Sequence, residues 1–182
     1  KGTYGKLLSG SMRRLGLRPK WSWDNWMADE NRSGLVPFDL HIHDSDFIVY
    51  AFGKPEKVTD FRAKRSEQDY INAVYEYDGF FLTTEASWYD SPYPFAADFR
   101  FQFEKAVVAW EKGEMKIYET DGKIWCPISN ASELGTGDIG LPASDAYANE
   151  INYFADCVRN NKPVDKFKPS ELECVLKILN NL

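Results

Sequence analysis

The stretch Ala97-Asp98-Phe99-Arg100-Phe101-Gln102-Phe103-Glu104 decides the fold class of this chain, because its apolar and polar residues alternate without a break. A period of two places successive side chains on opposite faces of a β-strand. One face of this strand is therefore aromatic and the other is polar. The pattern predicts a sheet with one covered face, and the aromatic row is expected in the core or in an interface.

Hairpin signals on both sides of this strand extend the prediction to an antiparallel sheet. Asp78-Gly79 and Asp121-Gly122 each separate two strand-like runs, and glycine tolerates the positive φ that a tight hairpin turn needs. The strands expected from these patterns span residues 3–17, 71–77, 80–88, 97–104, 115–120 and 124–128.

Three segments instead show helical spacing of their apolar residues. They span residues 34–53, 145–161 and 169–179, and the first has Pro37 in its opening turn and Gly53 at its end. Residues 18–34 and 129–144 are expected to be loops. The sum is an α+β fold, an antiparallel or mixed sheet with helices gathered on one face, built as one domain over residues 1–182.

Composition and charge exclude several classes of function. The chain has 182 residues, 43% of them hydrophobic, and a net charge of −6, which disfavours nucleic acids and anionic membrane surfaces as partners. No run approaches the roughly 20 apolar residues that a membrane span needs. Its three cysteines, Cys126, Cys157 and Cys174, have no CxxC spacing, so a reducing cytoplasm is expected.

The chain's two histidines lie together with three carboxylates in the segment Phe38–Asp46. On a helix, Asp39 and His43 are i and i+4 and share one face. An Asp beside a His orients the imidazole and raises its basicity, which suits a general base near neutral pH. The alternative is a solvated polar cluster at a helix start, where carboxylates favour the helix dipole.

The same residues admit a metal site. Asp39-Leu-His41-Ile-His43 on a strand is similar to the metal-binding opening of amidohydrolases and related hydrolases, because both imidazoles would point to one side. Such sites use further histidines downstream, and this chain has none. The helical spacing of residues 34–53 also disfavours the strand.

Two further motifs are weaker. Gly135-Thr136-Gly137-Asp138-Ile139-Gly140 matches GxGxxG, but no strand precedes it and no helix follows at once, so a loop is the favoured interpretation. The tryptophan-rich segment around Asn25 and Trp26 offers aromatic faces and hydrogen-bonding groups that suit a sugar. Its alternative is a small satellite core.

Residues 33–46, closing with Phe52-Gly53-Lys54-Pro55, resemble the signature of the glucose–fructose oxidoreductase and inositol dehydrogenase family (Gfo/Idh/MocA). That signature is a small-residue turn, a helix with Asp-x-Gly-x-His-x-x-Asp, and a Leu-Gly-x-Pro ending. Residues 150–163 and 170–182 resemble the family's last two helices. The chain is thus similar to the C-terminal half of a family member.

The resemblance implies a fold and a role. The fold is an open-faced, mainly antiparallel sheet with helices on one face, of the dihydrodipicolinate-reductase-like C-terminal type. The role is the substrate-binding and oligomerisation half of an oxidoreductase that moves hydride between NAD or NADP and a hydroxyl carbon of a sugar, inositol or similar polyol. The helices would lie against the N-terminal nucleotide-binding half, and the open sheet face would make homo-oligomers.

By motif position, His43 exchanges the proton of the substrate hydroxyl, and Asp39 orients the substrate and His43. Asn25, Trp26 and His41 are expected to contact the substrate, and His41 stands where the family commonly has glycine. The family's catalytic lysine and its cofactor site belong to the nucleotide-binding half. We therefore expect this chain alone to bind no NAD(P) and to catalyse nothing. A non-catalytic binding or oligomerisation module is the alternative, followed by the metal-dependent hydrolase.

Overall fold

The computed structural model describes residues 2–65, 68–127, 146–166 and 168–182. These residues contain an eight-stranded sheet with the order β2-β3-β4-β1-β5-β6-β7-β8. Neighbouring strands run antiparallel except β1 and β4, which are parallel. The strands are β1 (Leu7–Leu17), β2 (Lys57–Arg65), β3 (Gln68–Tyr77), β4 (Phe80–Tyr89), β5 (Ala96–Phe103), β6 (Ala106–Glu111), β7 (Glu114–Glu119) and β8 (Ile124–Trp125).

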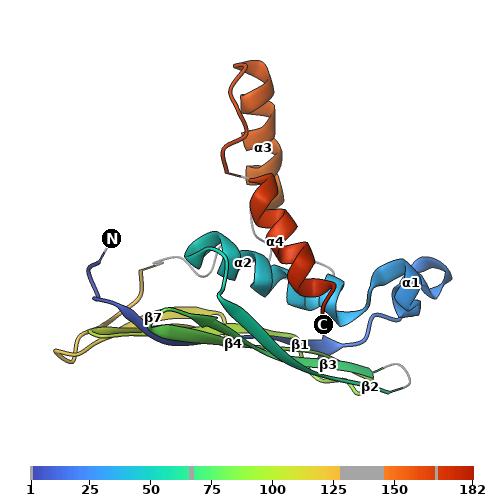
Figure 1. Ribbon diagram of the computed structural model, residues 1–182, viewed down its shortest axis with the longest axis horizontal. Coiled ribbons are helices and arrows are strands. Elements are labelled where there is room, and N and C mark those ends of the chain that lie inside the picture. The colour runs from blue at the N-terminus through green and yellow to red at the C-terminus, as the bar shows by residue number, and fades with distance from the viewer. Residues whose placement is uncertain (1, 66–67, 128–145, 167) are drawn as a thin grey trace.

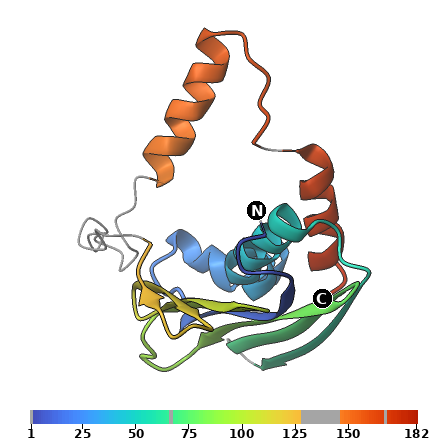
Figure 2. The ribbon, with the colours of Figure 1, turned by 90° about the vertical axis from the view of Figure 1, so that its left-hand side faces the viewer.

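The helices gather on one side of this sheet, and the other side is open (Figure 1). α2 and α4 lie over the sheet, whereas α3 projects away from it (Figure 2). The predicted α+β class, with an open-faced and mainly antiparallel sheet, is confirmed. The helical segments are η1 (Trp23–Ala28), α1 (Glu30–Ser33), the π-helix η2 (Pro37–His41), α2 (Ile42–Phe52), α3 (Ala146–Arg159) and α4 (Pro169–Leu179).

The aromatic row of β5 lies in the core between sheet and helices. Phe101 is buried with Met12 and Ile48, and Phe99 and Phe103 pack against the same cluster. The polar residues that alternate with this row face the open side, where Asp98 pairs with Arg13 of β1 at 2.6 Å. Of the two expectations for the row, core and interface, the structure therefore shows the core.

Several element bounds differ from the sequence-based expectation. β1 begins at Leu7 rather than residue 3, and the segment 18–34 contains η1 and α1 instead of a plain loop. The strands β2 and β6 had no predicted counterpart. On α4, Val175 and Leu179 are buried as expected, and they pack on Val49 of α2. On α3, by contrast, three residues of the predicted apolar face are exposed, namely Ile151, Phe154 and Val158, whereas Cys157 is buried.

A turn and a buried ion pair place the helix over the sheet. Gly34 and Leu35 both have positive φ, 71° and 58°, which reverses the chain before Pro37. Asp69 of β3 then accepts the Val36 N–H at 3.2 Å, and it is held in turn by Arg62 of β2. The start of η2 is therefore tied to two strands.

No helix of the described residues is long and apolar enough to cross a membrane.

Candidate functional site

Asp39 lies in the π-helical turn and is fixed by a tryptophan of the sheet. Trp88 of β4, 2% exposed, donates its Nε1–H to Asp39 Oδ2 at 3.0 Å. Burial raises the pKa of Asp39, whereas the Trp88 hydrogen bond and the charges of His43 and Arg14 act in the opposite direction. Single π-helical turns inside helices are frequent at functional sites. The carboxylate is thus oriented by a rigid neighbour while one oxygen stays available.

His43 lies one turn further along and is exposed on the helix surface. Burial by its neighbours lowers the pKa of His43, and the charge of Arg14 lowers it further. The carboxylates of Asp44, Asp39 and Asp46 raise it, but by less. A neutral imidazole near pH 7 can accept a proton, which is what a general base must do.

Asp39 and His43 therefore form one electrostatic unit, because each charge shifts the pKa of the other. One group is a hydrogen-bonded carboxylate and the other is an accessible imidazole. Together they can bind a hydroxyl and take its proton. The structure brings together the two residues that the sequence assigned to catalysis.

His41 points the other way, into the core. It has no exposed surface, and its Nε2 lies 3.0 Å from the hydroxyl of Tyr75, which also contacts Ser45 Oγ at 2.7 Å. The side chain thus fills the contact between the helix and the sheet. The structure does not bring His41 to the surface with His43, so the proposed site no longer includes it.

Because the imidazole of His41 is buried, we expect the stability of the fold to decrease in acid. Burial lowers the pKa of His41 from 6.5 to about 4. As the pH falls below 6.5 the unfolded chain takes up a proton that the folded chain excludes, so stability is lost between pH 6.5 and about 4. This difference is worth roughly 3 kcal/mol. We expect the free energy of unfolding, measured in urea at pH 7 and 4.5, to fall less in His41→Gln than in the wild type. Equal falls would contradict it.

The remaining predicted contacts lie on η1. Trp26 is half-buried and packs on the cluster that contains Trp88, the partner of Asp39. Asn25 is exposed and has a positive φ of 48°. The satellite-core alternative fits Trp26, whereas Trp21 and Trp23 are 76% and 81% exposed.

The metal alternative is contradicted by these positions. It requires His41 and His43 on one side of a strand, but the segment is helical and one imidazole is buried while the other is exposed. Among the described residues no group of three or more His, Cys, Asp or Glu side chains could hold a metal ion. The GxGxxG match at residues 135–140 lies outside the described residues.

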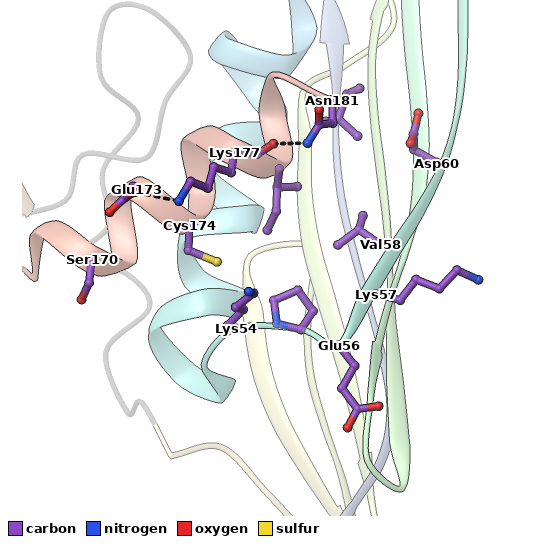
Figure 3. A pocket seen from close by; sticks show the side chains of 13 residues that line it. Lys54, Glu56, Lys57, Val58, Asp60, Ser170, Glu173, Cys174, Lys177 and Asn181 are labelled. Carbon is purple, nitrogen blue, oxygen red and sulfur yellow. Dashed lines mark hydrogen bonds and ion pairs between the residues drawn. The ribbon is translucent and has the colours of Figure 1, made fainter.

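A pocket of about 360 Å³ opens elsewhere, between α4 and the start of β2 (Figure 3). Val58, Cys174 and Ile178 are among its lining residues, and lysine and glutamate side chains surround them. Neither Asp39 nor His43 lines it. Asp39 and His43 therefore lie on the helix outside this pocket, and the pocket is a separate feature of the fold.

Sequence reasoning missed three residues of the site. Trp88, Arg14 and Asp44 act on Asp39 or His43, yet Trp88 and Arg14 come from strands far away in the chain. Of these three residues, only Asp44 could be suspected from the sequence, because it is next to His43. Its pairing with Arg14 depends on how the helix crosses β1, which no local pattern specifies.

Known structures share this fold. An oxidoreductase from Agrobacterium radiobacter, solved with NAD+, L-tartaric acid and magnesium, is 13% identical with a TM-score of 0.77, and the match covers 96% of this chain and 53% of that one. A UDP-N-acetylglucosamine 3-dehydrogenase from Acidithiobacillus ferrooxidans is 18% identical with a TM-score of 0.69, covering 99% and 53%. A levoglucosan dehydrogenase solved with NADH and L-sorbose is 12% identical with a TM-score of 0.75, covering 98% and 56%.

The chain thus spans about half the length of the solved structures it matches, and no curated protein sequence matches it. An open-faced, mainly antiparallel sheet with helices on one face is the fold that this chain shares with these solved structures. The GFO/IDH/MocA C-terminal domain model matches residues 1–124. The chain belongs to the Gfo/Idh/MocA family.

Proposed function

We propose that residues 1–182 form the substrate-binding domain of an NAD(P)-dependent dehydrogenase that acts on a hydroxyl of a sugar, inositol or similar polyol. The observation that carries this proposal is the electrostatic coupling of Asp39, fixed by Trp88, to an accessible His43 of lowered pKa. The sugar-related dehydrogenases of the same fold support the substrate class.

The chemistry assigns each residue a role. Oxidation of a secondary alcohol to a carbonyl removes a hydride, which NAD(P)+ accepts when bound, and a proton, which needs a base. His43 takes the hydroxyl proton, and Asp39 accepts a hydrogen bond that orients the substrate toward the imidazole. Trp26 and Asn25 of η1 are proposed to contact the sugar beside them.

The cofactor does not fit the described residues of this chain. A dinucleotide site uses a strand, a glycine-rich turn and a helix whose N-terminus faces the pyrophosphate. Here β1 leads into η1, whose residues Asp24 and Asn25 have non-helical dihedrals, and no such unit occurs in residues 2–65 or 68–127. We infer that an N-terminal nucleotide-binding domain holds NAD or NADP.

Two features support that partner domain. The relatives of known structure are nearly twice as long as this chain. Most large apolar residues of α3 are uncovered, with Tyr147, Ile151 and Val158 between 66% and 72% exposed. A helix that projects from the sheet with such a face fits a second domain (Figure 1).

We expect this chain, when it is separated from the nucleotide-binding domain, not to bind the cofactor. We expect the 182-residue chain to give no saturable change when NADH or NADPH fluorescence is titrated with it, because it lacks a dinucleotide site. The full-length protein that contains this chain is expected to bind one of the two at micromolar concentrations. Saturable binding by the isolated chain contradicts this division of roles.

The open sheet face is proposed to bind a second copy of the chain. It carries side chains of both charges, such as Arg100 and Glu111 at 3.8 Å, beside exposed Phe81, and mixed charges allow a self-complementary contact. Light scattering of the wild type and of Phe81→Glu tests this, since a monomeric wild type contradicts the proposal.

Free thiols at Cys157 and Cys174 support a reducing, cytoplasmic location.

A further inference from the structure

An ion pair lies directly beneath the candidate site. Arg14 of β1 reaches up to α2, where its Nη2 donates to Asp44 Oδ1 at 2.9 Å. Asp44 is 1% exposed, and the Arg14 side chain is 24% exposed. The preceding Arg13 points to the open face, because strand residues alternate sides. Arg14 is therefore directed toward the helix by the backbone itself.

This pair is poorly satisfied for a structural one. In the described part of the chain, Arg14 Nε and Asp44 Oδ2 are buried without a hydrogen-bond partner. Burying two charges costs desolvation free energy, and a partly satisfied pair recovers it poorly. Stabilisation of the fold therefore does not explain why this ion pair lies here. Its position beside the candidate site offers a better explanation.

Arg14 is the positive charge among the groups that act on His43. The others are the carboxylates of Asp39, Asp44 and Asp46, on the same helical stretch as the imidazole. Opposite charges nearby favour a protonated imidazole, and a protonated imidazole cannot accept a proton. Arg14 offsets these carboxylates from the sheet side, and it also favours the ionised form of Asp39.

We propose that Arg14, held in place by Asp44, is a positioning residue of the reaction that fixes a positive charge beside His43 so that the imidazole stands neutral toward the substrate hydroxyl. The inference rests on the proposed function and deepens it, because it names a charge that, together with burial, keeps the base unprotonated. Arg14 acts through His43 and is assigned no contact with the substrate.

NMR titration of the full 182-residue chain tests this without any activity. The chain has two histidines, so a His41→Gln spectrum assigns both imidazoles. Arg14→Met is expected to raise the pKa of His43, because it removes a nearby positive charge, and Asp44→Asn is expected to lower it, because it removes a nearby negative charge. A merely structural pair predicts the same direction for both variants, toward the ordinary value. An unmoved pKa of His43 in Arg14→Met overturns the proposal.

Two variants control for folding. Arg14→Lys keeps the charge and is expected to keep the pKa of His43 near that of the wild type. Arg13→Met removes an arginine of the same strand from the opposite face and is expected to leave it unchanged. If Arg14→Met does not fold, Arg14→Gln, which also removes the charge but keeps a hydrogen-bonding side chain, decides the sign of the effect.

Kinetics of the full-length protein separate this inference from the proposed function. The acid limb of kcat/KM is expected to move to higher pH in Arg14→Met, and to return in Arg14→Lys. If replacing His43 leaves the activity intact, the proposed function fails. If replacing His43 abolishes activity while Arg14→Met leaves the acid limb in place, only the role of Arg14 fails.

Discussion

Replacement of His43 by asparagine in the full-length protein is expected to lower kcat about 10²- to 10⁴-fold, the usual contribution of a general base. Asparagine keeps a polar side chain of similar reach but cannot take the hydroxyl proton. The measurement is NAD(P)H formation from a panel of sugars and polyols. Binding of NAD(P)H should stay unchanged, because the chain's described residues hold no dinucleotide site.

The pH profile adds a second readout. Burial and the charge of Arg14 lower the pKa of His43 below 6.5, so the wild type is expected to keep activity below that pH and to lose it as the imidazole protonates. The residual activity of His43→Asn should lack this acid limb. Glu173→Gln, an exposed carboxylate on α4 paired with Lys177, serves as the control and is expected to behave as wild type. Activity of His43→Asn within a few-fold of wild type contradicts the proposed base.

The parts of the fold that follow from local pattern could be predicted from the sequence. Alternation over residues 97–104 gave β5, and Gly79 and Gly122, with φ of 82° and 91°, occupy the turns expected of them. The missed strands break these rules. β2 carries Arg62 toward the helices, an inward charge, and β6 is continuously apolar from Ala106 to Ala109, so neither alternates.

The candidate site could be predicted only in part, for a similar reason. Helical spacing predicted Asp39 and His43 on one surface. The π-helical turn has no sequence signal, and the burial of His41 depends on which side of α2 meets the sheet. Arg14 and Trp88 reach the site because β1 and β4 are parallel neighbours, a long-range pairing. Chemistry carried by one segment is readable from sequence, whereas the partners supplied by other strands are not.

Asp69 is expected to be the residue whose removal destabilises the fold most among those discussed. It is 2% exposed, and it accepts from Arg62 Nε at 2.9 Å, from Arg62 Nη2 at 2.7 Å and from the buried Val36 N–H at 3.2 Å. Alanine leaves a guanidinium without its two-point partner and an amide without an acceptor. Breaking such a pair costs about 3–5 kcal/mol, so the free energy of unfolding of the chain in urea should fall by that amount.

A double-mutant cycle shows whether the pair or the amide dominates this loss. Arg62→Met with Asp69→Leu removes both charges, so the double variant should lose clearly less than the sum of the single losses, because no unpaired charge remains. The unpaired Val36 N–H persists in both Asp69 variants and sets the remaining cost, about 1–3 kcal/mol. Asp156→Ala, which breaks the exposed pair of this α3 residue with Lys162 at 3.0 Å, is the control and should cost far less than Asp69→Ala. If Asp69→Ala costs no more than this control, the tie between β2, β3 and the start of η2 does not hold the helix of the candidate site in place. The orientation of Asp39 and His43 must then come from the Trp88 and α4 contacts alone.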